Sequence, residues 1–147
     1  MQYNQSEFLI ETSVPEDELI ISRTDLKGNI THANELFCTI SGYEIDELIG
    51  KPHNIVRHPD MPKSIFKNLW DTLKEQKQWR GVVKNIRKDS GFYWANTIVS
   101  GVYKDGILVE YKSLIIAASY EDKLKYQKLY DKSRQENGEN IRKVIYE

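Results

Sequence analysis

The sequence predicts an α+β domain in which one five-stranded antiparallel sheet carries short helices gathered on one face. Two β-branched, apolar segments open the chain and three longer ones follow, at residues 19–24, 30–33, 79–87, 92–103 and 107–117. Gly28-Asn29 and Asp105-Gly106 separate neighbouring segments, and turns of this kind join antiparallel strands. The helical patterns fall between the two groups of strands, so we expect them to lie together over the sheet.

The helical patterns are short, and the clearest of them follows a proline-containing loop. Asn34 is suited to be the N-cap of a helix that Gly42 ends, and residues 43–50 predict another brief helical turn. Across residues 62–76, apolar side chains recur at helical spacing, at Ile65, Phe66, Leu69, Trp70 and Leu73. This stretch is therefore expected to be an amphipathic helix whose apolar face, with Trp70, meets the sheet.

The chain divides into a central domain and a flanking, partly helical segment at each end. We expect an N-terminal cap segment at residues 1–18, the central domain at 19–119 and a C-terminal helix and tail at 120–147. Within the first segment, residues 5–13 could form a short amphipathic helix, or a lead segment, that ends before Pro15.

The C-terminal segment is polar and charged. Tyr126, Leu129 and Tyr130 share one side of a helix there, but the apolar stripe is weak, and Gly138 is expected to end it. We therefore predict an exit helix that contacts a partner rather than joining the core.

The composition describes a globular chain of 147 residues, within the usual span of a single domain. Its 21 lysines and arginines nearly balance 22 acidic residues, so no strongly basic face favours nucleic acid or an anionic membrane. Cys38 is the only cysteine, which excludes an intramolecular disulfide and is typical of a reducing cytoplasm. The longest apolar run, residues 114–118, is far shorter than the roughly 20 residues that span a bilayer. We expect a cytoplasmic protein that a partner could recruit to the inner face of the membrane.

Residue types that commonly carry catalysis do not form a recognisable pattern. His32, His53 and His58 lack the spacing of metal ligands, and Cys38 lies apart from them in a predicted helix. The sequence contains no phosphate-binding glycine-rich loop and no nucleophile elbow. We therefore expect a binding domain rather than an enzyme.

A stiff polar loop, RHPDMP, runs from Arg57 to Pro62 ahead of the amphipathic helix. Its prolines fix their own φ and bias the preceding residues towards extended conformations. Singly, Arg57 and His58 are ordinary surface charges, but together with Asp60 they could hold phosphates or hydroxyls of a ligand, with Arg57 as the phosphate partner. His53, which follows a proline, either hydrogen-bonds a ligand edge or caps the local turn.

Three tryptophans and one asparagine raise the possibility of a planar ligand. Trp70, Trp79 and Trp94 fall within 25 residues, where they either fill the core or offer flat surfaces to a ligand. If odd-numbered positions of the strand at residues 79–87 face inward, the Asn85 amide is buried and costs about 1–3 kcal/mol without hydrogen-bond partners. A heterocycle with adjacent carbonyl and N–H groups would supply them. If even-numbered positions face inward, Asn85 meets water, and the alternation leaves both open.

These motifs, in this order, resemble a PAS domain of the flavin-binding, aerotaxis-receptor type. The resemblance is carried by TDLKGNITHAN (residues 24–34), SGY (41–43), ELIGKPHN (47–54), RHPDMP (57–62) and WRGVVKNIRK (79–88). It covers residues 19–119 and implies strand order 2-1-5-4-3, with the helices forming a pocket that holds FAD non-covalently. In that family the redox state of the flavin reports respiratory electron flow or oxygen.

The resemblance implies roles for the matching residues that would lie around the flavin ring. Trp70 would pack against the isoalloxazine ring, and Asn85 would hydrogen-bond its pyrimidine edge. His53 would stand near the flavin, and Asn34 would begin a helix that responds to the redox change. Light-sensing relatives of this fold need a reactive cysteine where this chain has His53, and Cys38 lies in the wrong helix, so blue-light adduct chemistry is not expected.

The resemblance also implies an exit path and a partner. Arg57, His58 and Asp60 would shape the loop through which the rest of FAD emerges. The signal would pass to a chemoreceptor-like transducer with HAMP and signalling domains, from an excised domain or from a stand-alone sensor, and a homodimer is conceivable. The alternatives are a PAS domain that binds haem or a small metabolite, with His53 or His58 as ligand, and a ligand-free dimerisation module.

Overall fold

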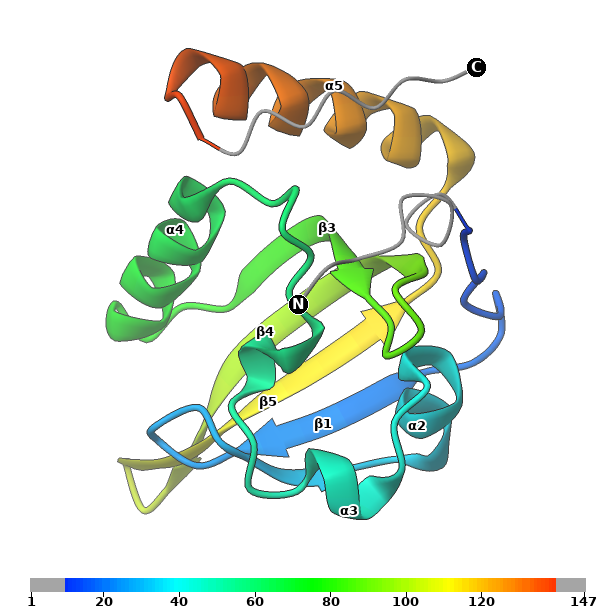
Figure 1. Cartoon of the computed structure of the whole chain (residues 1–147). Coiled ribbons are helices and arrows are strands. Elements are labelled where there is room, and N and C mark those ends of the chain that lie inside the picture. Colours follow the sequence, from blue (N-terminus) through cyan, green and yellow to red (C-terminus); the bar gives the residue numbers. More distant parts are fainter. Residues whose placement is uncertain (1–9, 140–147) are drawn as a thin grey trace.

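The centre of the molecule is a five-stranded antiparallel sheet. The computed structural model describes residues 10–139. The strands are β1 (Ile20–Thr24), β2 (Ile30–Ala33), β3 (Trp79–Ile86), β4 (Phe92–Lys104) and β5 (Ile107–Ile116). Their order across the sheet is β2-β1-β5-β4-β3, as predicted (Figure 1). The three long strands follow one another along the chain as hairpins, while β1 pairs with β5 and brings the first hairpin to the same sheet.

Four short helical elements between β2 and β3 cover one face of the sheet (Figure 1). They are α2 (Glu35–Ser41), α3 (Ile45–Leu48), η1 (His53–Val56) and α4 (Lys63–Lys74). Asn34 caps α2 as predicted, because its Oδ1 accepts a hydrogen bond from the Phe37 N–H at 3.1 Å. Gly42 ends α2 at φ +79°, a conformation that glycine adopts without steric cost. Within residues 10–139, no helix has the length and hydrophobicity of a bilayer span.

A long C-terminal helix, α5 (Tyr120–Glu136), packs against β3 (Figure 1). The Tyr130 hydroxyl donates to the main-chain carbonyl of Val82, and Tyr130 and Arg134 are both buried. The prediction that this segment stays out of the core is therefore wrong for these two residues, and its contact with a partner stays a prediction. The weak apolar stripe was misleading because α5 is anchored by a tyrosine hydroxyl and a buried arginine, which hydrophobic periodicity does not register.

The first described residues are extended rather than helical. Glu11 forms a parallel bridge with Phe92, and the Thr12 N–H donates to the Phe92 carbonyl at 2.8 Å. Of the two alternatives for residues 5–13, the helix is wrong for residues 10–13, where long-range pairing replaces local structure and the chain forms an extended lead segment. Residues 5–9 lie outside the described part. Val14 then enters the core.

Candidate functional site

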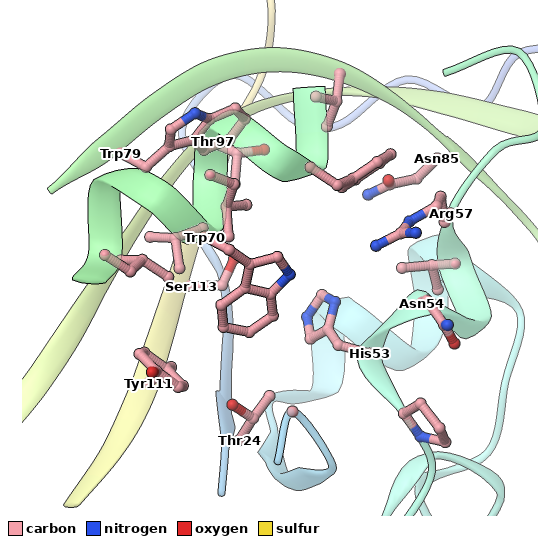
Figure 2. A pocket seen from close by; sticks show the side chains of 18 of the residues that line it. Thr24, His53, Asn54, Arg57, Trp70, Trp79, Asn85, Thr97, Tyr111 and Ser113 are labelled. Atoms are coloured by element: carbon pink, nitrogen blue, oxygen red, sulfur yellow. The ribbon is translucent and has the colours of Figure 1, made fainter. Parts of the chain in front are cut away.

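A cavity of about 270 Å³ lies between the sheet and its helical cover. The sheet contributes Thr24, Trp79, Val83, Asn85, Thr97, Val99, Tyr111, Ser113 and Ile115, and α4 contributes Phe66, Leu69, Trp70 and Leu73. The β1–β2 turn and the segment around η1 complete the lining with Lys27, Gly28, Pro52, His53, Asn54, Val56 and Arg57. Four of the seven predicted site residues are thus brought together: His53, Arg57, Trp70 and Asn85 (Figure 2).

Trp70 presents an indole ring to the cavity from α4 (Figure 2). The ring meets Tyr111 of β5 edge to face, with centroids 5.4 Å apart, yet Trp70 is 38% exposed. The other two tryptophans are buried. Trp79 donates its indole N–H to the Asn68 Oδ1 at 2.9 Å, and Trp94 lies under the Lys84 ammonium, 5.4 Å from the ring centroid. Trp70 therefore has free ring surface for a ligand, whereas Trp79 and Trp94 mainly build the fold.

Asn85 faces the cavity because the odd-numbered positions of β3 point inward, together with Trp79 and Val83. It is 8% exposed, and its side chain hydrogen-bonds the Tyr93 hydroxyl, its cross-strand neighbour. Burial raises the pKa of Tyr93, so this hydroxyl stays protonated. An amide has two donor hydrogens and one acceptor oxygen, so Asn85 retains hydrogen-bonding capacity towards the cavity.

His53 is held in a neutral form at the junction of η1 and the sheet. Its Nε2 lies 3.0 Å from the Ser22 Oγ of β1, and its ring packs edge to face against Phe37. Burial lowers the pKa of His53 to about 4, and the nearby Arg57 cation acts in the same direction. The ring also hydrogen-bonds the main chain of His53 itself, so a role in capping the local turn stays a prediction beside the contact across the fold. At neutral pH it offers the cavity a polar but uncharged ring.

The RHPDMP loop divides its charged residues between two environments. Arg57 lies at the cavity rim with its guanidinium 3.5 Å from the centre of the Phe66 ring, and partial burial lowers its pKa from the ordinary value. His58 and Asp60 are 1% and 2% exposed and are outside the lining. The Asp60 carboxylate instead pairs with Lys84 at 3.4 Å and with Arg134 at 3.3 Å. His58 is therefore not a surface charge.

Three predicted site residues support the cavity instead of lining it. His58 and Asp60 are buried behind the residues that line the cavity. Asn34 links the start of α2 to β1, because its amide donates to the carbonyl of Leu19, just before β1, at 2.8 Å, and accepts from the Ile21 N–H at 3.1 Å. Asn34 begins α2 as expected, whereas His58 and Asp60 lie where they can shape the loop and not where they would touch a ligand in the cavity.

Several lining residues were missed by the sequence analysis. Lys27, in the turn between β1 and β2, places a second cation at the rim with Arg57. Thr97 and Ser113 place hydroxyls on the floor of the cavity (Figure 2). Polar residues at the inward positions of otherwise apolar strands were the available signal, and it was overlooked.

A single antiparallel sheet with a helical cover and a cavity between the two is the architecture of a PAS domain. The chain belongs to this family, because the family profile described as the PAS fold matches residues 30–115. The resemblance inferred from the sequence motifs is thereby confirmed.

Known relatives agree with this assignment. The chain is 42% identical over 119 residues to the aerotaxis receptor of Escherichia coli (strain K12), covering 81% of this chain and 24% of the receptor. It is 32% identical over 94 residues to the nitrogen fixation regulatory protein of Klebsiella pneumoniae, covering 64% of this chain and 19% of that protein. The dark structure of the blue-light photoreceptor Aureochrome1 LOV superposes with a TM-score of 0.65 at 20% identity, covering 80% of this chain and 86% of that one. The last similarity concerns the fold alone.

Proposed function

We propose that this chain is a PAS sensor that binds FAD non-covalently in the cavity and signals its redox state to a chemotaxis-type transducer. The observation that carries the proposal is the set of side chains that converge on the cavity: a half-exposed indole, a buried amide and a neutral imidazole, from Trp70, Asn85 and His53 (Figure 2). The relatives named above are a receptor and a regulatory protein, and this chain spans about a quarter of their length or less.

The residues fit the two edges of an isoalloxazine ring. Its apolar edge needs flat or aliphatic surface, which Trp70 and Leu69 of α4 supply. Its pyrimidine edge carries carbonyl and N–H groups, which match the donor and acceptor groups of the Asn85 amide. The neutral state of His53 allows this ring to lie near a flavin without adding charge.

The rim fits the remainder of the cofactor. The cavity volume of about 270 Å³ lies just below the ~300–1,000 Å³ usual for ligand pockets, so a dinucleotide would lie partly outside it. Arg57 and Lys27 both border the opening, and two cations are suited to a pyrophosphate. This rim favours FAD over an uncharged planar ligand.

Bound there, FAD would supply a redox state that changes the charge and protonation of the ring. The chain's own residues would convert this into movement, because Asn85 belongs to β3 and its main chain pairs with Arg57. A change in the hydrogen bonds of Asn85 would thus act on β3 and on the loop beside it. Any such switch requires the oxidised and reduced ligand to have different affinities for two conformations.

The haem alternative receives less support from the geometry. His58 lies outside the lining, and the Nε2 of His53 is engaged by Ser22. Within the described part of the chain, no group of histidine, cysteine and acidic residues has the arrangement of a metal site. A cavity lined by several polar groups also argues for a ligand over a purely dimerising module.

The partner is proposed to be a chemoreceptor-like signalling domain, on the same chain or on another, with the sensor on the cytoplasmic side of the membrane. Absorbance of the purified protein tests the cofactor directly. We expect a yellow protein that releases FAD on heating, identified by chromatography against FMN. A colourless protein that takes up no FAD from solution, or one with a Soret band, would overturn the proposal.

A further inference from the structure

A cluster of buried charges lies behind the cavity wall, outside the lining residues. Lys84 Nζ donates to one oxygen of the Asp60 carboxylate at 3.4 Å, and Arg134 Nη1 donates to the other at 3.3 Å. None of the three residues is more than 7% exposed. Buried charges are costly unless they are paired, so Asp60 depends on its two cations, and Arg134 pairs in addition with the exposed Asp131 of its own helix. Helix α5 thus supplies a charge to a cluster that the loop and β3 also build.

The loop of residues 57–62 connects this cluster to the cavity. Arg57 lines the cavity rim and its main chain bridges to Asn85, whereas Asp60, three residues later, lies in the cluster. The Asp60 N–H donates to the Nδ1 of His58 at 3.0 Å, and two prolines restrict the backbone. We expect a loop this short and internally bonded to move as a unit, so that a displacement at Asp60 reaches Arg57.

The C-terminal segment also holds α4, the helix that follows the 57–62 loop. The Glu139 carboxylate accepts a hydrogen bond at 3.1 Å from the N–H of Lys63, the first residue of α4. The N-cap residue of α4 is Pro62, which offers no side-chain cap, so Glu139 takes that role. Helix α4 carries Phe66, over which the Arg57 guanidinium lies. Arg134 and Glu139 lie beyond the matched family region. They hold the 57–62 loop and helix α4, the two parts of the fold that position Arg57.

We propose that Arg134 is a positioning residue of the cavity: through Asp60 it holds the 57–62 loop against β3 and so keeps Arg57 at the rim. The binding part of this inference rests on the proposed function, but the structural part does not. Linkage makes the effect reciprocal, since a ligand that needs the ordered loop also stabilises the docked position of α5.

The test compares R134Q with K132Q, which removes an exposed cation from the same helix. FAD is titrated into flavin-free protein, and binding is followed by the quenching of flavin fluorescence. We expect R134Q to weaken binding by roughly 3- to 30-fold, the range typical of residues that act through a neighbour, and K132Q to leave it unchanged. R134K, which keeps the charge, should recover part of the loss.

A double-mutant cycle separates positioning from general destabilisation. In protein that already carries R57A, the group being positioned is absent, so R134Q should weaken FAD binding no further. If the double variant instead loses FAD affinity by the product of the two single losses, the proposal is overturned.

Hydrogen exchange decides the structural part without any flavin. The amides of residues 57, 58, 60 and 61 should exchange faster in R134Q than in K132Q or wild type, while thermal unfolding stays cooperative. Wild-type protein that binds no FAD would refute the proposed function, and the exchange comparison would still decide the role of Arg134. Equal exchange in all three proteins would refute that role. If R134Q does not fold, R134K serves in the same comparisons with a smaller expected effect, since it keeps the charge but loses the planar guanidinium.

Discussion

Replacing Asn85 with alanine removes an amide that β3 holds inside the cavity, and the structure sets the size of the effect. One hydrogen bond of this amide goes to Tyr93, which leaves about two for the pyrimidine edge of a flavin. At about 0.5–1.5 kcal/mol each, their loss amounts to about 1–3 kcal/mol, or a 5- to 150-fold increase in Kd.

Asn96 offers a matched control for this substitution. It lies on β4 opposite Val82, at an outward position that does not line the cavity. Titration calorimetry with FAD should show weaker binding for Asn85→Ala and unchanged binding for Asn96→Ala, with thermal unfolding confirming that both fold. If Asn85→Ala binds FAD within two-fold of wild type, the assignment of Asn85 to the pyrimidine edge is wrong.

Three further predictions concern the cavity wall, α5 and pH. Trp70→Ala should weaken FAD binding by about 2- to 12-fold, from a lost aromatic contact of about 0.5–1.5 kcal/mol, and Trp70→Phe should retain most of it; equal titrations for both would contradict stacking. Tyr130→Phe should lower the free energy of unfolding in urea by about 1 kcal/mol, because the Val82 carbonyl loses its donor, whereas Tyr126→Phe, at a half-buried site, should cost less. Burial lowers the folded pKa of His53 to about 4, so the unfolded chain binds the extra proton and stability should fall as pH drops from about 6.5 towards 4. Urea unfolding at pH 7 and pH 5 should show a smaller difference for His53→Gln, and an unchanged difference would exclude His53 as the cause.

The sheet and α4 could be predicted because local pattern determines them. Turn residues mark each hairpin, and the spacing from Ile65 to Leu73 defines a helix with one apolar face. The inward position of Asn85 could not be decided, since both faces of β3 are buried. Alternation reports burial only when one face meets water, and α5 removes that contrast.

The positions of His58 and Asp60 could not be predicted for a different reason. A loop with a cation, an imidazole and a carboxylate reads as solvent-exposed until its partners are known. Those partners are Lys84, within an apolar strand, and Arg134, 74 residues beyond Asp60. Pairing over such a separation leaves no local pattern. Lys84 shares one face of the strand with Val82 and Ile86, and a lysine between two apolar residues on one face was the available signal.

The outer strands of the sheet carry a further consequence for how the molecule avoids self-association. Unpaired main-chain groups on an edge strand are a template for strand addition from another chain. On β3, the Val82 carbonyl is taken by Tyr130 and the Lys84 N–H points to the Met61 sulfur at 3.4 Å. On β2, Ile30 exchanges main-chain hydrogen bonds with residues 50 and 51. At these positions the main-chain groups of both edge strands are occupied, which directs association with other proteins towards the sheet face and the helices. Undocking of α5 would expose the Val82 carbonyl of β3 to strand addition and so favour aggregation.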